Sequence, residues 1–172
     1  MRVSSISSVS YFRNFIFGVE DSLVSTVGLL SGVAVAGVPR ETIFLTGVIL
    51  IFVEAFSMGA GSLLAESSAV EYANGPKGIS KQNIFSGLVM FVSYFVSGFI
   101  PLSAYLFLPV KTALIFSVLL SLVALFVLGL IGAKISGVKP FKNGLRIFLI
   151  GGFAIFLGLI VGSVLSKSLL IS

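Results

Sequence analysis

The chain of 172 residues contains no cysteine and no histidine. Their absence excludes disulfides, zinc fingers, thiolate sites and imidazole catalysis. Charged residues are also scarce, at 10% of the chain, while 57% of the residues are hydrophobic. An ordinary soluble domain is about 25% charged, so the composition predicts a membrane protein. The length suits one compact bundle of helices rather than two domains.

Acidic residues are missing from the chain after residue 71. This asymmetry predicts that any ion chemistry belongs to the first two apolar segments and that the rest of the chain is a scaffold. The net charge of +5 does not indicate nucleic-acid binding, because the bases lie in short loops beside apolar segments, where they act as topology signals. All the acids lie early in the chain, at Glu20, Asp21, Glu41, Glu54, Glu66 and Glu71.

Five apolar segments are long enough to cross a bilayer, for which a helix needs about 20 residues. We expect an all-α membrane protein, with one transmembrane domain over residues 1–172 and a short cytosolic loop at about 66–82. Turn signals separate the segments: Pro39 and Pro109 precede two of them, and Thr42 and Ser80 are expected helix caps. The expected spans are about 15–37, 43–65, 83–107, 110–133 and 145–166.

Five spans place the two termini on opposite sides of the membrane. The positive-inside rule favours a cytosolic N-terminus and an outer C-terminus, because most Lys and Arg residues then face the cytosol. We therefore expect an integral multi-pass protein of the plasma membrane in a prokaryote, or of a vacuolar or other endomembrane in a eukaryote. The cytosolic bases would be Arg2, Arg13, Lys77, Lys81, Lys134, Lys139, Lys142 and Arg146, and the outer ones Arg40, Lys111 and Lys167.

Three carboxylates lie inside the first two spans, and two of them are the main site candidates. Asp21 is in the first, and Glu54 is in the second, where Met58 follows one turn later on the same face. Counting from the span ends places Asp21 and Met58 at a similar depth. A charge in the hydrocarbon is costly, so such carboxylates usually mark a functional site. Carboxylates bind hard cations and protons, whereas a thioether favours transition metals, so we expect these three residues to hold Fe²⁺ or Mn²⁺.

Other polar positions have two interpretations each. Glu20 points about 100° away from Asp21 around the helix, so it reaches either the headgroups or a neighbouring helix. Glu66 and Glu71, near the cytosolic surface, are either solvated or form a funnel that admits cations. Met90 has no acid nearby in the sequence, and we expect it to fill a gap in the core.

Glycines recur at helix-packing spacing. Gly28 and Gly32 form a GxxxG pair in the first span, and Gly158 and Gly162 form another in the last. Such pairs let helix backbones approach closely in lipid. The first pair therefore predicts either packing within the bundle or dimerisation through the first span.

Two motifs resemble those of the vacuolar iron transporter family. The first is Arg13-Asn14 with Glu20-Asp21-Ser22-Leu23-Val24-Ser25, and the second runs from Glu54 through Ser57-Met58 to Gly61. The resemblance implies a five-span homodimer that exports Fe²⁺ or Mn²⁺ from the cytosol in exchange for protons, with Asp21 and Met58 lining a path at the dimer interface. It implies no permanently bound cofactor, and its partners would be a second copy, the lipid bilayer and the metal ions.

The chain departs from the family pattern at a few positions. Asn14 stands at the usual aspartate and Ser62 at a position where a glutamate is common; Glu20 and Ser22 replace asparagine and glycine. The segment 66–82 stands where vacuolar members carry a cytosolic metal-binding domain.

Two other functions remain open from the sequence. One is a non-transporting membrane scaffold, in which the acids bind a partner helix. The other is a transporter of organic cations, in which the acids meet a substrate ammonium. We do not expect an enzyme, because the sequence shows no nucleophile–base pair and no metal triad.

Overall fold

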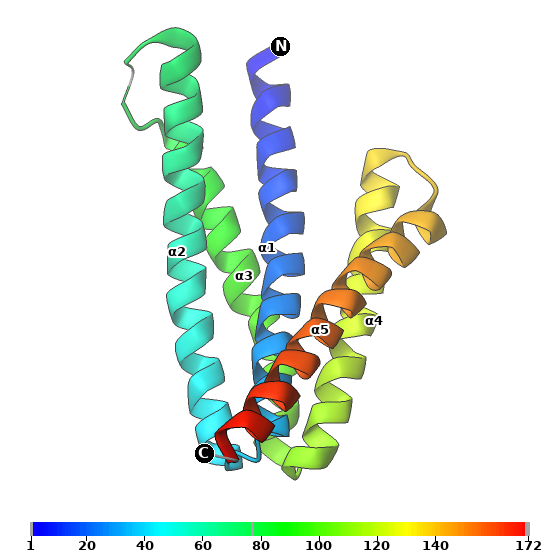
Figure 1. Ribbon diagram of the computed structural model, residues 1–172. Helices are drawn as coiled ribbons and strands as arrows, with labels where there is room; N and C mark the ends of the chain where they lie inside the picture. The colour runs from blue at the N-terminus through cyan, green and yellow to red at the C-terminus, as the bar shows by residue number, and fades with distance from the viewer. Residues whose placement is uncertain (1, 77, 171–172) are drawn as a thin grey trace.

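The computed structural model of the protein describes residues 2–76 and 78–170. Within them the chain forms five long helices joined by short connections (Figure 1). Each of the five is long and apolar enough to cross a membrane, which confirms the expected all-α, five-span integral membrane protein. The helices are α1 (Arg2–Val35), α2 (Arg40–Asn74), α3 (Lys81–Phe107), α4 (Val110–Ser136) and α5 (Pro140–Leu170).

Prolines and one serine define where the helices begin. Pro39 and Pro109 directly precede α2 and α4, where the fixed φ of proline suits the start of a helix. The Ser80 side chain accepts a hydrogen bond from the backbone N–H of Asn83 at 3.2 Å, so its predicted role as the cap of α3 is confirmed. The expected cap at Thr42 is wrong, because α2 has already begun at the residue after Pro39.

The connection between α2 and α3 is only a part of the segment 66–82. Of the expected loop 66–82, the first part continues α2 as far as Asn74, and α3 already begins at Lys81. Gly75 follows α2 with a φ of +77°, a left-handed conformation that glycine adopts without steric cost. Residues 75–80 alone therefore join the two helices.

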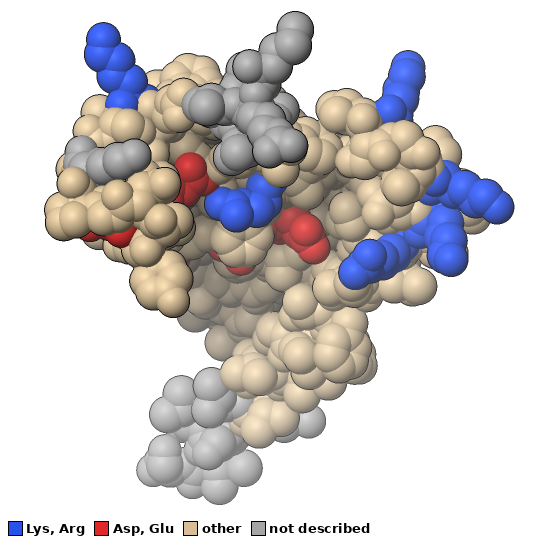
Figure 2. Space-filling model, turned by 90° about the horizontal axis from the view of Figure 1, so that it is seen from above, with Lys and Arg blue, Asp and Glu red and all other residues tan. Residues whose placement is uncertain are grey.

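The helix α1 lies in the middle of the bundle and contacts each of the other four (Figure 1). The start of α1, the α2–α3 connection and the α4–α5 turn lie at one end, which we call the basic end. Seen from this end, most basic side chains stand around the rim, and one lies near the middle between acidic side chains (Figure 2). The described bases there are Arg13, Lys81, Lys134, Lys139, Lys142 and Arg146, against Arg40 and Lys111 at the opposite end.

Apolar packing is closest toward the opposite end. One cluster joins the first four helices there and includes Leu30, Ile43, Leu102 and Ala113. A second cluster joins α1 to α4 and α5 through residues that include Leu23, Val27, Leu125 and Ile155. From these contacts the α4–α5 pair leans away from α2 and α3 toward the basic end (Figure 1).

The two GxxxG pairs pack against each other within the chain. A Cβ built on Gly158 would lie 2.9 Å from the carbonyl oxygen of Gly28, and one on Gly162 would overlap the backbone of Gly32. The helices α1 and α5 therefore cross with their backbones in contact. Of the two interpretations of Gly28 and Gly32, packing within the bundle is the one observed, and α5 already occupies this face of α1.

We expect Gly162→Ala to destabilise the bundle, because the added methyl group has no room against α1. Overpacking of this kind typically costs about 1–3 kcal/mol. The matched control is Gly28→Ala in the same contact, since a Cβ there meets nothing within 4 Å. Thermal unfolding in detergent measures both changes. Equal midpoints for the two variants would contradict the close crossing of α1 and α5.

Candidate functional site

Side-chain hydrogen bonds set the register of α1 against α2 and α3. The Asn14 amide donates to the Ser62 hydroxyl of α2 at 2.7 Å and to the Ser86 hydroxyl of α3 at 2.6 Å. Further along α1, the Ser22 hydroxyl donates to the carbonyl oxygen of Tyr94 at 2.7 Å. Both bonds to α3 join residues 72 apart in the sequence, so the parallel helices α1 and α3 keep one offset between these levels.

These registers define three levels along α1, about one turn apart. Asn14 occupies the level nearest the basic end. One turn further in, antiparallel pairing brings Met58 level with Gly18, and a Cβ built on Gly18 would lie 3.1 Å from the sulfur of Met90. The next turn brings Asp21 level with the turn of α2 that holds Glu54.

The structure brings the carboxylates of Asp21 and Glu54 together. Both side chains are half-buried, and they are close enough to repel each other electrostatically. Tyr94 lies within electrostatic reach of both, and its hydroxyl hydrogen-bonds Ser25 at 2.7 Å. The expected shared depth of Asp21 and Met58 is wrong by about one turn, because both helices extend past the span ends from which it was counted. The partner of Asp21 at its own level is Glu54.

Met58 faces a groove between α1 and α2. The groove holds a cavity of about 640 Å³ whose floor is formed by Met90 of α3. Among the described residues, no group of three or more His, Cys, Asp or Glu side chains could hold a metal ion, so this part of the chain does not form a closed carboxylate site. The cavity is lined by Arg13, Asn14, Phe17, Ser57, Met58, Gly61, Ser62, Ala65 and Met90.

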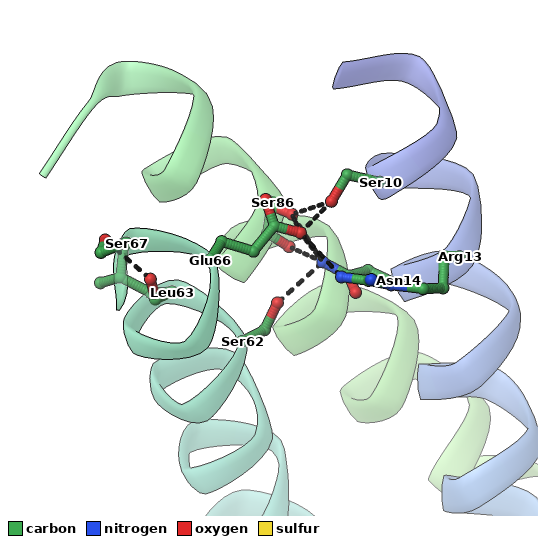
Figure 3. Close-up of polar contacts among 8 residues, drawn as sticks. All are labelled: Ser10, Arg13, Asn14, Ser62, Leu63, Glu66, Ser67 and Ser86. Atoms are coloured by element: carbon green, nitrogen blue, oxygen red, sulfur yellow. Dashed lines mark hydrogen bonds and ion pairs between the residues drawn. The ribbon is translucent and has the colours of Figure 1, made fainter. Parts of the chain in front are cut away.

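Glu66 lies at the centre of a polar cluster that joins the three helices (Figure 3). One of its carboxylate oxygens accepts hydrogen bonds from Arg13 at 3.0 Å, from the Ser86 hydroxyl at 2.8 Å and from the Ser10 hydroxyl. Its side chain is only 17% exposed. The interpretation of Glu66 as a solvated surface residue is therefore wrong, whereas Glu71 is exposed. The residues next to Glu66 in the sequence do not indicate these contacts.

The ion pair between Arg13 and Glu66 lies between two hollows of the same groove. Toward the basic end, a cavity of about 460 Å³ is lined by Ser10, Arg13, Ala65 and Glu66 with neighbouring residues. Arg13 and Ala65 also line the cavity of Met58. The pair therefore separates the outer hollow from the inner one.

Glu20 faces away from the groove. It lines a separate cavity of about 410 Å³ with Asn143 and Arg146 of α5, and Arg146 attracts its carboxylate. Of the two alternatives for this residue, contact with a neighbouring helix is observed. Glu20 and Asp21 thus serve different sides of α1.

The sequence of the chain that forms this groove resembles those of known proteins. A sequence model of the VIT family matches residues 12–84 and 72–163, which together include α1 from Phe12 onward and nearly all of the remaining helices. The chain belongs to the VIT family. This confirms the resemblance seen in the two motifs.

Three plant relatives match part of this VIT-family chain. Vacuolar iron transporter 1 of Eucalyptus grandis is 36% identical over 75 residues, which are 43% of this chain and 30% of the relative. A vacuolar iron transporter of Centaurea cyanus is 35% identical over 82 residues, 45% of this chain and 34% of the relative. Vacuolar iron transporter 1 of Tulipa gesneriana is 36% identical over 70 residues, 40% and 28% of the two chains. The match spans about a third of each relative.

Two departures of this VIT-family chain from the family pattern contact each other. Asn14 and Ser62 are the hydrogen-bonded pair that joins α1 to α2. Both side chains are neutral, and the carboxylate nearest to them is that of Glu66, one turn further along α2 and 3.5 Å from the Asn14 amide. Near Asn14 and Ser62, the carboxylate is therefore supplied by Glu66.

We expect Asn14→Ala to loosen α1 from both neighbours, because it removes the hydrogen bonds to Ser62 and Ser86 and leaves buried polar groups without a partner. Such a loss costs about 1–3 kcal/mol. Asn74→Ala is the matched control, since Asn74 is exposed and bonds only its own helix. Unfolding by denaturant in detergent compares the two, and equal free energies of unfolding would contradict the role given to Asn14.

Proposed function

We propose that the protein transports a divalent transition metal, Fe²⁺ or Mn²⁺, out of the cytosol in exchange for protons. One observation carries the proposal: Asp21 and Glu54 lie within electrostatic reach of each other on helices that can span a membrane, and the charged neighbour acting on Asp21 is a second carboxylate. The names of the plant relatives support iron as the metal. The basic end would face the cytosol, following the positive-inside rule.

Exchange of metal for protons follows from the charges of Asp21 and Glu54. Two carboxylates close together in a medium of low dielectric repel each other unless cations neutralise them. Two protons or one divalent ion supply the same positive charge, and the site cannot hold both. Metal arriving from the cytosol would release the protons, and an acidic compartment outside would reload them and displace the metal.

The assembly we propose is a two-fold homodimer with the groove at its interface. The groove opens between α1 and α2, and one chain offers only Asp21, Glu54 and Met58, too few ligands to enclose an ion. The face of α1 that carries Gly28 and Gly32 is already covered by α5. A second copy over the open groove would complete the site with its own three residues.

The absence of native cysteine allows a direct test of this assembly. Ser57→Cys places a thiol in the exposed groove, and we expect a short bifunctional maleimide to link two copies in the membrane. Phe153→Cys is the control, because Phe153 is 63% exposed on α5, away from the groove. A monodisperse monomer that still transports metal would sink the dimer proposal.

Proteoliposomes that contain a pH dye test the transport proposal. We expect Fe²⁺ or Mn²⁺, added without oxygen, to drive proton movement in the wild type. Asp21→Asn should reduce this movement to the level of empty liposomes, and Glu54→Gln should weaken or uncouple it, because each removes one of the two exchanging carboxylates. Glu41→Gln is the matched control, since Glu41 is exposed at the opposite end.

The same assay separates the rival functions. Metal uptake without proton movement would favour a channel or a uniporter. Flux of a quaternary ammonium ion but not of metal would favour an organic-cation transporter, and no flux of either would favour a scaffold. Full exchange by Asp21→Asn would mean that another carboxylate, with Glu20 the next to test, carries the protons.

A further inference from the structure

The soft metal ligands of this chain meet in one place. The sequence contains three methionines, no cysteine and no histidine. Apart from Met1, both methionines, Met58 of α2 and Met90 of α3, line the same cavity of about 640 Å³. The sequence alone assigned Met90 to the core, because Met58 and Met90 are remote in the chain and only the helix register brings them together.

Glycines bring the two methionine positions to one level. Gly18 of α1 lies beside Met90 of α3. A Cβ added to Gly18 would lie 3.1 Å from the Met90 sulfur and 3.0 Å from Cβ of Ser93. On α2, a Cβ at Gly59, the residue after Met58, would lie 2.9 Å from Cβ of Phe91, the residue after Met90. Close backbone contact of α2 and α3 therefore holds the two methionine positions side by side.

The chemistry of this cavity differs from that of the acidic level. Its lining contains no carboxylate, and its one charged residue is Arg13. Arg13 is paired with Glu66 at 3.0 Å, so the cavity has no unpaired acidic group of its own to attract a hard divalent ion. Thioethers are soft ligands that bind Cu⁺ better than hard or borderline divalent ions.

We propose that Met58 and Met90 form a second cation position that selects soft monovalent cations such as Cu⁺. It lies about one turn from Asp21 and Glu54, on the basic-end side. The methionine pair would bind a soft ion without the help of the acidic pair. The inference shares with the proposed function Met58 and the groove as the path of the ion, and binding is measurable on protein that does not transport.

Silver tests the position as a redox-inert soft cation. Purified protein in detergent and chloride-free nitrate buffer is dialysed against Ag⁺, and bound silver is counted per chain. We expect one tight site in the wild type. Met58→Leu and Met90→Leu keep the side-chain volume and lose the sulfur, and each should weaken binding by at least about tenfold, as loss of a metal ligand does.

Two further variants make the result specific. The double leucine variant keeps Met1 and so reports any silver bound elsewhere, and we expect it to lose the tight site. Asp21→Asn should bind Ag⁺ as the wild type does, since the acidic level is separate. X-ray absorption at the silver edge should show two sulfur neighbours in the wild type and one in each single variant.

The possible outcomes separate this inference from the transport proposal. If Met90→Leu binds silver as tightly as the wild type does, Met90 is a packing residue and not a ligand. If the wild type has no tight silver site, the inference is overturned. Intact silver binding together with no metal-driven proton movement would sink the transport proposal and leave the methionine position standing.

Discussion

The buried amide of Asn14 is the constraint on which the polar half of this bundle depends. A buried amide needs hydrogen-bond partners, and this one finds them on α2 and α3 at the same level of α1. Because the bonds run to both neighbours, they set two registers at once. Those registers decide that Asp21 lies level with Glu54 and that two methionines share a cavity. The chemistry of the groove thus follows from one neutral side chain near its mouth.

The bundle consists of two parts that meet along α1: the first three helices, and the pair α4 and α5. The first three helices carry every acidic residue and the groove, whereas the charged residues of α4 and α5 are all bases. Glycine contacts hold α5 tightly against α1, so the second part covers one face of the helix that bears Asp21. The other face remains open. A polar site between membrane helices needs this kind of support, because its own repelling charges do not hold the helices together.

Hydropathy and turn residues were sufficient to predict the five helices, since bilayer thickness and helix breakers act locally on the chain. The cost of charge in lipid singled out Asp21 and Glu54 as candidate site residues, but it did not predict that they lie at one level. The level of Met58 could not be predicted, because a slip of one turn between helices leaves every local signal unchanged. The contacts of Glu66 and the convergence of Met58 with Met90 depend on that same register. Local sequence patterns do not determine this register, because it is set by the hydrogen bonds of Asn14 to α2 and α3.

The six-residue connection after Asn74 has a consequence for how this architecture accepts change. The helices α2 and α3 are each aligned through α1, and their backbones also touch at Gly59 and Gly87. Neither alignment depends on the chain that links them outside. The cost of closing a longer loop rises only slowly with its length. We therefore expect the groove to keep its geometry when a folded module is inserted between residues 75 and 80.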